Sequence, residues 1–219
     1  MNDLELLAQS DLFSAFDPEA LTRVLASAYP VRYRRNQVIF NEGDKAEALY
    51  GVRTGRIAIG LQSHDGRESL LALMEAGDLF GDMPLFDRGG RSAQARALET
   101  SDLVCVPYPP VRAVLEEAPD LLWCVVAMLS RRLRSTDAAL ADSVFLDVTG
   151  RTAKRLLELA GDADTFVLPI TQEELAGLVG ASRERVNKAI AAFVRLGWLD
   201  QVDRRYRIRD RAQLVRRAR

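Results

Sequence analysis

The sequence contains few of the side chains on which most enzyme chemistry depends, with one histidine and two cysteines among 219 residues. One histidine cannot supply the two or three imidazole ligands of a typical catalytic zinc site, and a Ser-His-Asp triad would have to use His64. This residue lies in Ser63-His64-Asp65-Gly66, a sequence typical of a solvated hairpin turn and a poor place for a buried general base. We therefore expect neither an enzyme nor a metal site.

Disulfide bonds, membrane helices and a signal peptide are not predicted either. Cys105 and Cys124 are too few for a disulfide scaffold and form no CxxC pair, which favours the reducing cytoplasm. No apolar run approaches the roughly 20 residues that cross a bilayer. The start of the chain, Asn2-Asp3-Leu4-Glu5, is acidic and unlike a signal peptide. We expect a cytoplasmic protein without membrane attachment.

Charge is unevenly distributed along a chain whose formal net charge is only −1. Residues 150–219 contain 15 Lys+Arg and 9 Asp+Glu, a net charge of +6, which leaves 15 and 22 for residues 1–149, a net charge of −7. An acidic front and a basic rear suggest two domains, of which the second faces a polyanion. Chance clustering of surface charge is the alternative.

Short strands separated by turns are predicted between residues 29 and 107, after a helix that begins at Asp17-Pro18. Strand-like runs occupy residues 38–40, 48–53, 56–62 and 68–74, a spacing that favours an antiparallel sandwich or small barrel. Residues 80–86 differ from their surroundings and predict a single helical turn. A glycine-rich loop follows and leads to Arg91 and Ser92.

The residues in and after this turn are suited to bind one small anion. The free backbone N–H groups of a helix start at Gly81, the guanidinium of Arg91 and the hydroxyl of Ser92 match a singly charged phosphodiester. Asp82 would repel a phosphate, but its carboxylate can accept a hydrogen bond from a sugar hydroxyl. Taken alone, the composition fits an ordinary surface loop equally well.

A long helix over residues 120–144 is predicted to pair with a second helix. The residues of its seam follow a period of 3.5, typical of a coiled coil, and the simplest partner is a second copy of the chain. A core helix packed within one chain is the alternative. Thr136 is an unexpected polar residue in this seam, which consists of Leu122, Val126, Leu129, Leu133, Thr136, Leu140 and Ser143.

Residues 171–196 have the pattern of a helix-turn-helix, after a linker or hinge expected at residues 147–150 and a helix over residues 151–160. Thr171 and Glu174 form a capping box, Gly180 suits a turn with positive φ, and Ser182 caps the second helix. An αα-hairpin without a role in DNA binding is the alternative.

The second of these helices presents side chains that suit DNA. Arg183 can donate two hydrogen bonds to guanine, Glu184 can accept one from cytosine, and Lys188 lies further along the helix. Residues 198–202 and 206–209 predict a β-hairpin around the turn at residues 203–205, as in the wing of a winged helix. Its arginines would lie near the DNA backbone: Arg204, Arg205, Arg207 and Arg209.

Over nearly its whole length the chain resembles the cyclic-AMP receptor (CRP/FNR) family of transcription regulators, and the ending Arg216-Arg217-Ala218-Arg219 is most similar to actinobacterial members. The resemblance implies an α+β protein with a jelly-roll-like cyclic-nucleotide-binding β-roll (1–116), a dimerisation helix and hinge (117–146) and a winged helix-turn-helix (147–219). Three stretches carry it: Phe80-Gly81-Asp82-Met83-Pro84-Leu85-Phe86 with Arg91-Ser92-Ala93, Phe145-Leu146-Asp147-Val148-Thr149-Gly150-Arg151, and Val179-Gly180-Ala181-Ser182-Arg183-Glu184-Arg185-Val186.

The family also implies roles for individual residues. The cyclic phosphate would lie on the residues matching Gly81, Arg91 and Ser92, the ribose 2′-OH on Asp82, and the base between Thr136 and Asp137 of the two subunits. We therefore expect a nucleotide site that comprises Gly81, Asp82, Met83, Arg91, Ser92, Thr136 and Asp137. We expect DNA to contact Thr171, Gln172, Ser182, Arg183, Glu184, Lys188 and Arg204.

Four residues depart from the family pattern. Asp82 is one methylene shorter than the usual glutamate, and Pro84 replaces a small residue and lacks an N–H. Asp137 replaces a serine or asparagine and offers only acceptors at neutral pH. Lys188 stands where many members have arginine, so an ammonium replaces a guanidinium that can donate two parallel hydrogen bonds.

The expected function is that of a homodimeric regulator that binds a pseudo-palindromic DNA site under the control of a cyclic nucleotide, cAMP first, with RNA polymerase as a further partner. An iron–sulfur sensor would need four ligands, and two cysteines cannot supply them. A haem sensor would depend on His64. The remaining alternatives are the same DNA-binding regulator with another effector or none, and a cupin-like enzyme, which lacks the histidine ligands it would need.

Overall fold

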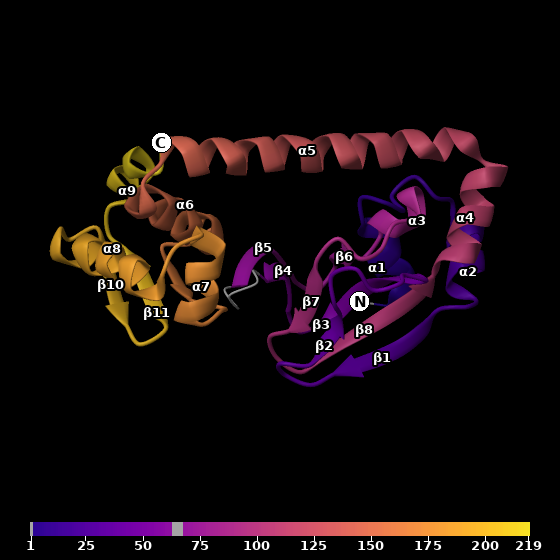
Figure 1. The fold of residues 1–219 in the computed structure, drawn as a ribbon, viewed down its shortest axis with the longest axis horizontal. Helices are drawn as coiled ribbons and strands as arrows, with labels where there is room; N and C mark the ends of the chain where they lie inside the picture. The colour runs from indigo at the N-terminus through magenta and orange to yellow at the C-terminus, as the bar shows by residue number, and fades with distance from the viewer. Residues whose placement is uncertain (1, 63–67) are drawn as a thin grey trace. The chain divides into compact units, whose positions relative to one another are not determined.

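A computed structural model describes residues 2–62 and 68–219, so the turn predicted around His64 lies outside the described residues. The chain divides into two compact units, one that extends to Leu133 and one over Arg134–Arg219 (Figure 1). The boundary falls within one long helix. Each unit has its own buried core.

The first unit is built around two antiparallel sheets of four strands each. Their facing surfaces share a small apolar core of Val52, Ile57, Phe80, Ala95, Ala97 and Leu103. Of the two architectures that the strand spacing favours, the sandwich and the small barrel, the structure has the sandwich. One sheet has the order β1 (Tyr29–Tyr33), β8 (Ser101–Pro107), β3 (Ala48–Thr54), β6 (Leu79–Phe80), and the other has the order β2 (Val38–Phe40), β7 (Gln94–Ala97), β4 (Ile57–Gln62), β5 (Glu68–Met74).

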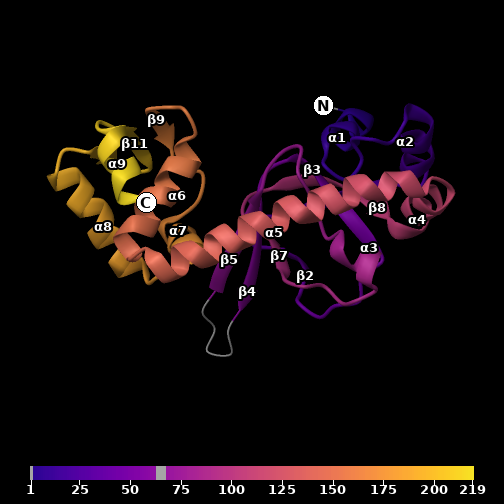
Figure 2. The same ribbon diagram turned by 90° about the horizontal axis from the view of Figure 1, so that it is seen from above.

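Helices cover the outer surface of the first sheet and form a second, larger core with it (Figure 2). Asp17 caps α2 by accepting a hydrogen bond from the backbone N–H of Ala20, as the sequence predicts. The sequence reasoning did not identify α1, which buries Leu6 and Leu7 in this core. The helices of this unit before the long one are α1 (Asp3–Gln9), α2 (Pro18–Leu25), α3 (Met83–Asp87), α4 (Tyr108–Glu117) and the 3-10 turn η1 (Pro119–Leu121).

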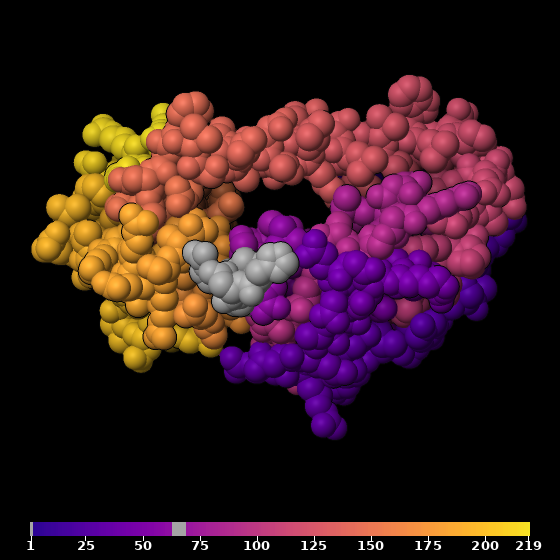
Figure 3. Space-filling view, in the orientation of Figure 1, coloured from indigo at the N-terminus to yellow at the C-terminus, as the bar shows by residue number. Residues whose placement is uncertain are grey.

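The long helix α5 (Leu122–Phe145) has two different sides. Val125 and Met128 are buried in the core of the first unit. The apolar residues of the predicted seam are not covered, and the outer side of the helix is open along its length in Figure 3. The exposed fractions lie between 41% and 64% for Leu122, Val126, Leu129, Leu133 and Leu140.

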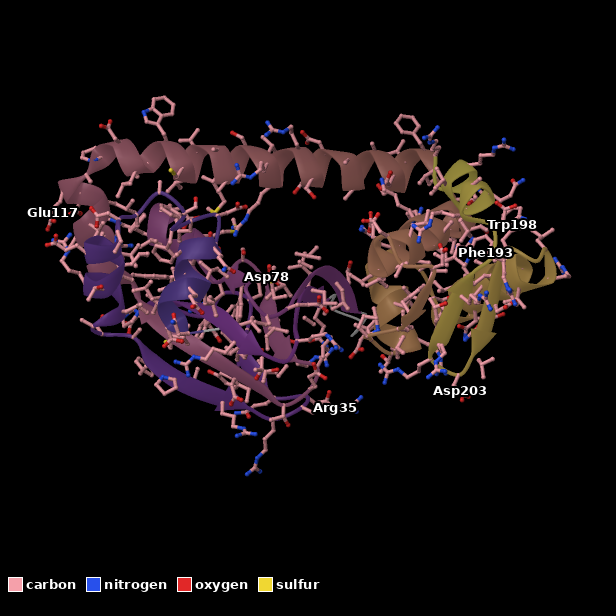
Figure 4. All side chains as sticks on the ribbon, turned by 180° about the vertical axis from the view of Figure 1, so that it is seen from behind. Arg35, Asp78, Glu117, Phe193, Trp198 and Asp203 are labelled. Atoms are coloured by element: carbon pink, nitrogen blue, oxygen red, sulfur yellow. The ribbon has the colours of Figure 1, made fainter. Side chains whose placement is uncertain are left out.

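The second unit combines helices with a three-stranded antiparallel sheet of order β10-β11-β9. The rings of Phe193 and Trp198, both labelled in Figure 4, stack with centroids 5.8 Å apart. After α5 its elements are α6 (Val148–Ala160), β9 (Thr165–Val167), α7 (Gln172–Val179), α8 (Arg183–Arg195), β10 (Leu199–Val202), β11 (Arg205–Ile208) and α9 (Arg211–Arg217).

The break between α5 and α6 is shorter than predicted. The carboxylate of Asp147 accepts a hydrogen bond from the backbone N–H of Gly150 at 2.8 Å, so it caps α6, which begins at Val148 rather than at Arg151. The wing turn is also shorter, because Arg205 pairs with Val202 in the ladder. Asp203, at the tip of the hairpin in Figure 4, has the positive φ of 53° that such a tight turn requires.

The last helix packs against the first turn of α6. The backbone oxygen of Arg217 lies 2.9 Å from the place that a Cβ on Gly150 would take, so only glycine fits there. The side chain of Arg217 pairs with the carboxylate of Asp147. Among the described residues, no helix is both long enough and apolar enough to cross a bilayer.

Candidate functional site

Gly81 begins the turn between β6 and α3, and no other residue fits there. Its φ of +76° lies in the left-handed region, and an added Cβ would come within 2.6 Å of Nη1 of Arg91. Its carbonyl oxygen accepts hydrogen bonds from that nitrogen at 2.8 Å and from the hydroxyl of Tyr108 at 2.5 Å. The expected anion-binding turn is therefore held in close contact with Arg91.

Arg91 is a buried cation, only 5% exposed, and most of its hydrogen-bonding groups are engaged. Besides Gly81, Nη1 donates to the hydroxyl of Tyr108 at 3.1 Å, and Nη2 donates to the carbonyl of Ala48 at 2.8 Å. The guanidinium carbon lies 4.1 Å from the centroid of the Phe40 ring. The whole side chain is thus fixed from several directions.

One donor of Arg91 remains unsatisfied. Its Nε is buried and has no hydrogen-bond partner within the described part of the chain. A buried N–H of a charged group without an acceptor is costly, so this site is suited to receive an anionic oxygen. The donor set therefore fits the phosphate of a cyclic nucleotide, with Arg91 as its cationic ligand.

Ser92 and Met83 lie at the exposed entrance to this turn. The hydroxyl of Ser92 donates to the sulfur of Met83 at 3.3 Å, and both side chains are open to solvent. Pro84 lies in the first turn of α3, where a missing N–H breaks no helical hydrogen bond. The structure thus brings together in one unit the five expected nucleotide contacts that precede α5.

Asp82 is the most deeply buried carboxylate of the site, 3% exposed, and it is paired. Both of its oxygens accept from Nη1 of Arg132 on α5, at 3.1 and 2.9 Å. The sequence reasoning missed Arg132. A buried carboxylate needs a cation, and this requirement could have directed attention to the arginines of the following helix. The residue expected to bind ribose is therefore tied to α5.

Thr136 and Asp137 belong to the second unit. Both side chains are exposed on α5, beyond Leu133, where the first unit ends. The residues expected to contact the base therefore belong to a different unit from those expected to contact the phosphate and the ribose.

The helix-turn-helix has the local geometry that the sequence predicts. The hydroxyl of Thr171 accepts from the N–H of Glu174, and the Glu174 carboxylate accepts from the N–H of Thr171, which completes the capping box. Gly180 ends α7 with a φ of +67°, and Ser182 caps α8 by accepting from the N–H of Arg185. The hydroxyls of Thr171 and Ser182 thus set the helix ends from which DNA contacts would be made.

The first turns of α8 present exposed charges. Glu184 and Lys188 form an ion pair of 2.7 Å, and each side chain is about three-quarters exposed. The ammonium of Lys188 lowers the pKa of Glu184 below its ordinary value. Arg183 is exposed next to them. The surface that is expected to read DNA is therefore charged and open.

Two further residues expected to contact DNA, Arg204 and Gln172, also form hydrogen bonds within the protein. The guanidinium of Arg204 donates to the carbonyls of Leu168 and Ile170, at 3.0 and 3.3 Å from Nη2, and so holds the segment before α7. The amide of Gln172 donates to the hydroxyl of Tyr206 at 2.6 Å. In the described residues, no group of three or more His, Cys, Asp or Glu is placed to hold a metal ion.

Comparisons with known proteins agree with this organisation. Residues 30–118 match the cyclic nucleotide-binding domain, and residues 150–217 match the Crp-like helix-turn-helix domain. The chain is 38% identical over 222 residues to the CRP-like cAMP-activated global transcriptional regulator of Mycobacterium tuberculosis, covering 98% of this chain and 99% of the relative. It is 34% identical over 166 residues to the cAMP-activated global transcriptional regulator CRP of Escherichia coli, covering 73% and 79%.

A solved structure supports the same assignment. The c-di-GMP responsive global regulator CLP of Xanthomonas campestris aligns with a TM-score of 0.75 at 27% identity, over 88% of this chain and 99% of that one. Both domains are matched in order, and the similarity to the mycobacterial regulator extends along almost the entire chain. The protein therefore belongs to the cyclic-AMP receptor (CRP/FNR) family of transcription regulators, as its motifs indicate.

Proposed function

We propose that the protein is a homodimeric regulator whose affinity for a specific DNA site is controlled by a cyclic nucleotide, with cAMP as the first candidate. The observation that carries this proposal is the buried guanidinium of Arg91, which retains one N–H without an acceptor beside Gly81. Neutral ligands would not satisfy this charge as well as an anionic oxygen does. Two relatives are described as cAMP-activated.

The nucleotide would be held by its phosphate, its sugar and its base. The phosphate would contact Arg91, the backbone at Gly81 and the hydroxyl of Ser92. Its 2′-OH would donate to Asp82, whose carboxylate it would share with Arg132. Met83 would lie along the ligand, and Thr136 and Asp137 would contact the base from the two subunits.

Dimerisation is supported by the uncovered apolar side of α5. A seam of period 3.5 that remains 41% to 64% exposed is destabilising in a lone chain and favours pairing with an identical helix. We propose three functional parts: the β-roll over residues 1–116, the dimerisation helix and hinge over 117–146, and the DNA-binding domain over 147–219. A two-fold axis along α5 explains why the operator would be pseudo-palindromic.

The proposed DNA surface centres on the start of α8. Arg183 and Glu184 would contact base edges, and Lys188 would contact a phosphate or a base. Thr171, Gln172 and Ser182 would contact the backbone near the ends of the two helices, and Arg204 would support the wing. As a regulator of transcription in the cytoplasm, the dimer would also contact RNA polymerase.

A second candidate function is the same DNA-binding regulator with another effector or none. The ion pair between Asp82 and Arg132 favours this alternative, because the protein already satisfies the carboxylate meant for ribose. The Xanthomonas relative is described as c-di-GMP responsive, so a larger cyclic nucleotide is a further possibility within this class.

Two experiments separate these candidates. Isothermal titration of the purified protein with cAMP, cGMP and c-di-GMP identifies the ligand, and an Arg91→Lys variant controls for phosphate-specific binding. A gel-shift titration on a palindromic TGTGA-type site, with and without each nucleotide at one stated salt concentration, then measures the effect on DNA. Heat and tighter DNA binding with cAMP alone support the proposal. DNA binding that no nucleotide changes, together with no heat at millimolar ligand, supports the alternative.

A further inference from the structure

Tyr108 connects Gly81 and Arg91, two parts of the nucleotide site that are separate in the sequence. It is the first residue of α4, it is buried, and its hydroxyl donates to the carbonyl of Gly81 at 2.5 Å. The same oxygen accepts from Nη1 of Arg91 at 3.1 Å. One phenol hydroxyl thus bridges the anion-binding turn and the cation of the site.

This contact restricts how the guanidinium of Arg91 can rotate. The other acceptors of its two Nη atoms are the backbone carbonyls of Gly81 and Ala48, so Tyr108 provides the side-chain acceptor among these bonds. With both Nη atoms engaged, Nε is the buried donor left over. The hydrogen bond from Nη1 to Tyr108 therefore fixes the guanidinium in the orientation that leaves Nε free to bind a ligand.

The phenol of Tyr108 keeps its proton at neutral pH. Burial raises the pKa of Tyr108 above its usual value, so the O–H that donates to Gly81 remains protonated. The ring packs in the larger core of the first unit, and the hydroxyl at its end bonds to the carbonyl of Gly81. A phenylalanine would keep the packing and lose both hydrogen bonds.

We propose that Tyr108 is a positioning residue of the nucleotide site, which sets the plane of the Arg91 guanidinium so that its Nε–H faces the cyclic phosphate. This inference rests on the proposed cyclic nucleotide function and names a residue outside the expected contact set. Tyr108 does not contact the ligand itself. Its effect on binding passes through Arg91.

Arg112 provides a matched control on the same helix. It lies one turn after Tyr108, its guanidinium carbon is 6.0 Å from the centroid of the Tyr108 ring, and it donates from Nε and Nη2 to the carbonyl of Leu85 in the middle of α3, at 3.2 and 3.0 Å. An Arg112→Gln variant weakens the anchoring of α3 to α4 and removes none of the hydrogen bonds of Arg91. Tyr108→Phe removes the contact with Arg91 and leaves Arg112 in place.

Binding of cAMP and of its Sp and Rp phosphorothioates by the full-length protein tests the role of Tyr108. In these two diastereomers sulfur replaces one or the other of the two non-bridging phosphate oxygens, so the ratio of their Kd values reports which of these positions the guanidinium faces. We expect Tyr108→Phe to weaken cAMP binding about tenfold, as for loss of a hydrogen bond to a charged group, and to bring the ratio closer to one. Arg112→Gln should keep the wild-type ratio. A Tyr108→Phe variant with the wild-type Kd and ratio overturns the inference.

A measurement without ligand separates failure of this inference from failure of the proposed function. The buried Nε–H of Arg91 should give a slowly exchanging NMR resonance, identified by its loss in Arg91→Lys. We expect Tyr108→Phe to shift this resonance and speed its exchange, because the guanidinium gains freedom. An unchanged resonance overturns the positioning role, whether or not the wild-type protein binds a nucleotide. Wild-type protein that binds none of the nucleotides overturns the proposed function instead.

Discussion

The carboxylate of Asp82 and the guanidinium of Arg132 are paired across 50 residues of sequence, with both carboxylate oxygens bonded to one nitrogen. The pair joins Asp82, the residue proposed to bind the ribose, to the first half of α5. A ligand that donates a hydrogen bond to the carboxylate of Asp82 would therefore change the environment of Arg132, a residue on the helix that is proposed to form the dimer.

Removing Arg132 should destabilise the first unit, because a buried charge loses its partner. We expect Arg132→Met to lower the free energy of unfolding by about 1–3 kcal/mol. Asp82→Asn in the same chain should restore most of that loss, since the neutral amide needs no cation. Urea unfolding of the two single variants and the double variant gives the coupling energy. A purely additive cycle would show that the pair contributes nothing.

Gly81→Ala should abolish tight nucleotide binding. The new methyl group would come within 2.6 Å of Nη1 of Arg91 and would also place alanine at a φ of +76°. The backbone strain alone costs about 1–2 kcal/mol. Gly197→Ala is the matched control, because its φ of +73° is close to that of Gly81 and its Cβ meets nothing within 4 Å. We expect both variants to be less stable and only Gly81→Ala to lose cAMP affinity, measured by calorimetry.

Asp147→Ala should destabilise the start of α6 by about 0.5–2 kcal/mol, the usual cost of losing an N-cap. The backbone N–H of Gly150, and then the guanidinium of Arg217, lower the pKa of Asp147 below its ordinary value. Because the folded pKa is lowered, the stabilisation is complete above the unfolded pKa of about 3.9 and is lost as the pH falls below it. Hydrogen exchange of α6 amides, compared with wild type at pH 7 and in acid, checks this. A difference that persists undiminished in acid contradicts the assignment.

Arg183→Ala should weaken specific DNA binding by about 1–3 kcal/mol and relax the preference at one base pair. Arg195→Ala is the control, because this exposed arginine ends the same helix. Binding to the preferred site and to single-base variants at fixed salt gives both quantities. An unchanged base preference in Arg183→Ala would remove this residue from direct readout.

Leu133→Asp should convert the dimer to a monomer, since it places a charge in the centre of the seam on α5. Ala138→Asp adds the same charge two residues after Thr136, outside the heptad seam, and should leave the dimer intact. Sedimentation at several concentrations distinguishes them. Equal dimerisation of both variants would show that the subunits meet elsewhere.

The elements governed by local chemistry were predictable from the sequence. The capping box of Thr171 and Glu174, the turn at Gly180 and the start of α2 at Asp17 depend on neighbours a few residues away. The break at Asp147 was predicted too long, because its capping role was not recognised and the segment was interpreted as a hinge. The helix α9 was missed because Leu214 is its one fully buried side chain, which gives no apolar pattern.

The contacts that complete the site were not predictable in the same way. Arg132 is 50 residues away from Asp82, to which it is paired, and Tyr108 is 27 residues away from Gly81, to which it donates a hydrogen bond. Only the packing of α4 and α5 brings them there. Arg204 illustrates the same limit, since a turn arginine can face a phosphate or, as here, the carbonyls of Leu168 and Ile170.

The close packing of Arg217 on Gly150 has a practical consequence for handling the protein. A purification tag or fluorescent protein placed directly after α9 would begin beside the first turn of α6. A bulky fusion there competes with the ion pair between Arg217 and Asp147. A reporter is better joined before α1, with a spacer that leaves the cap at Asn2 free.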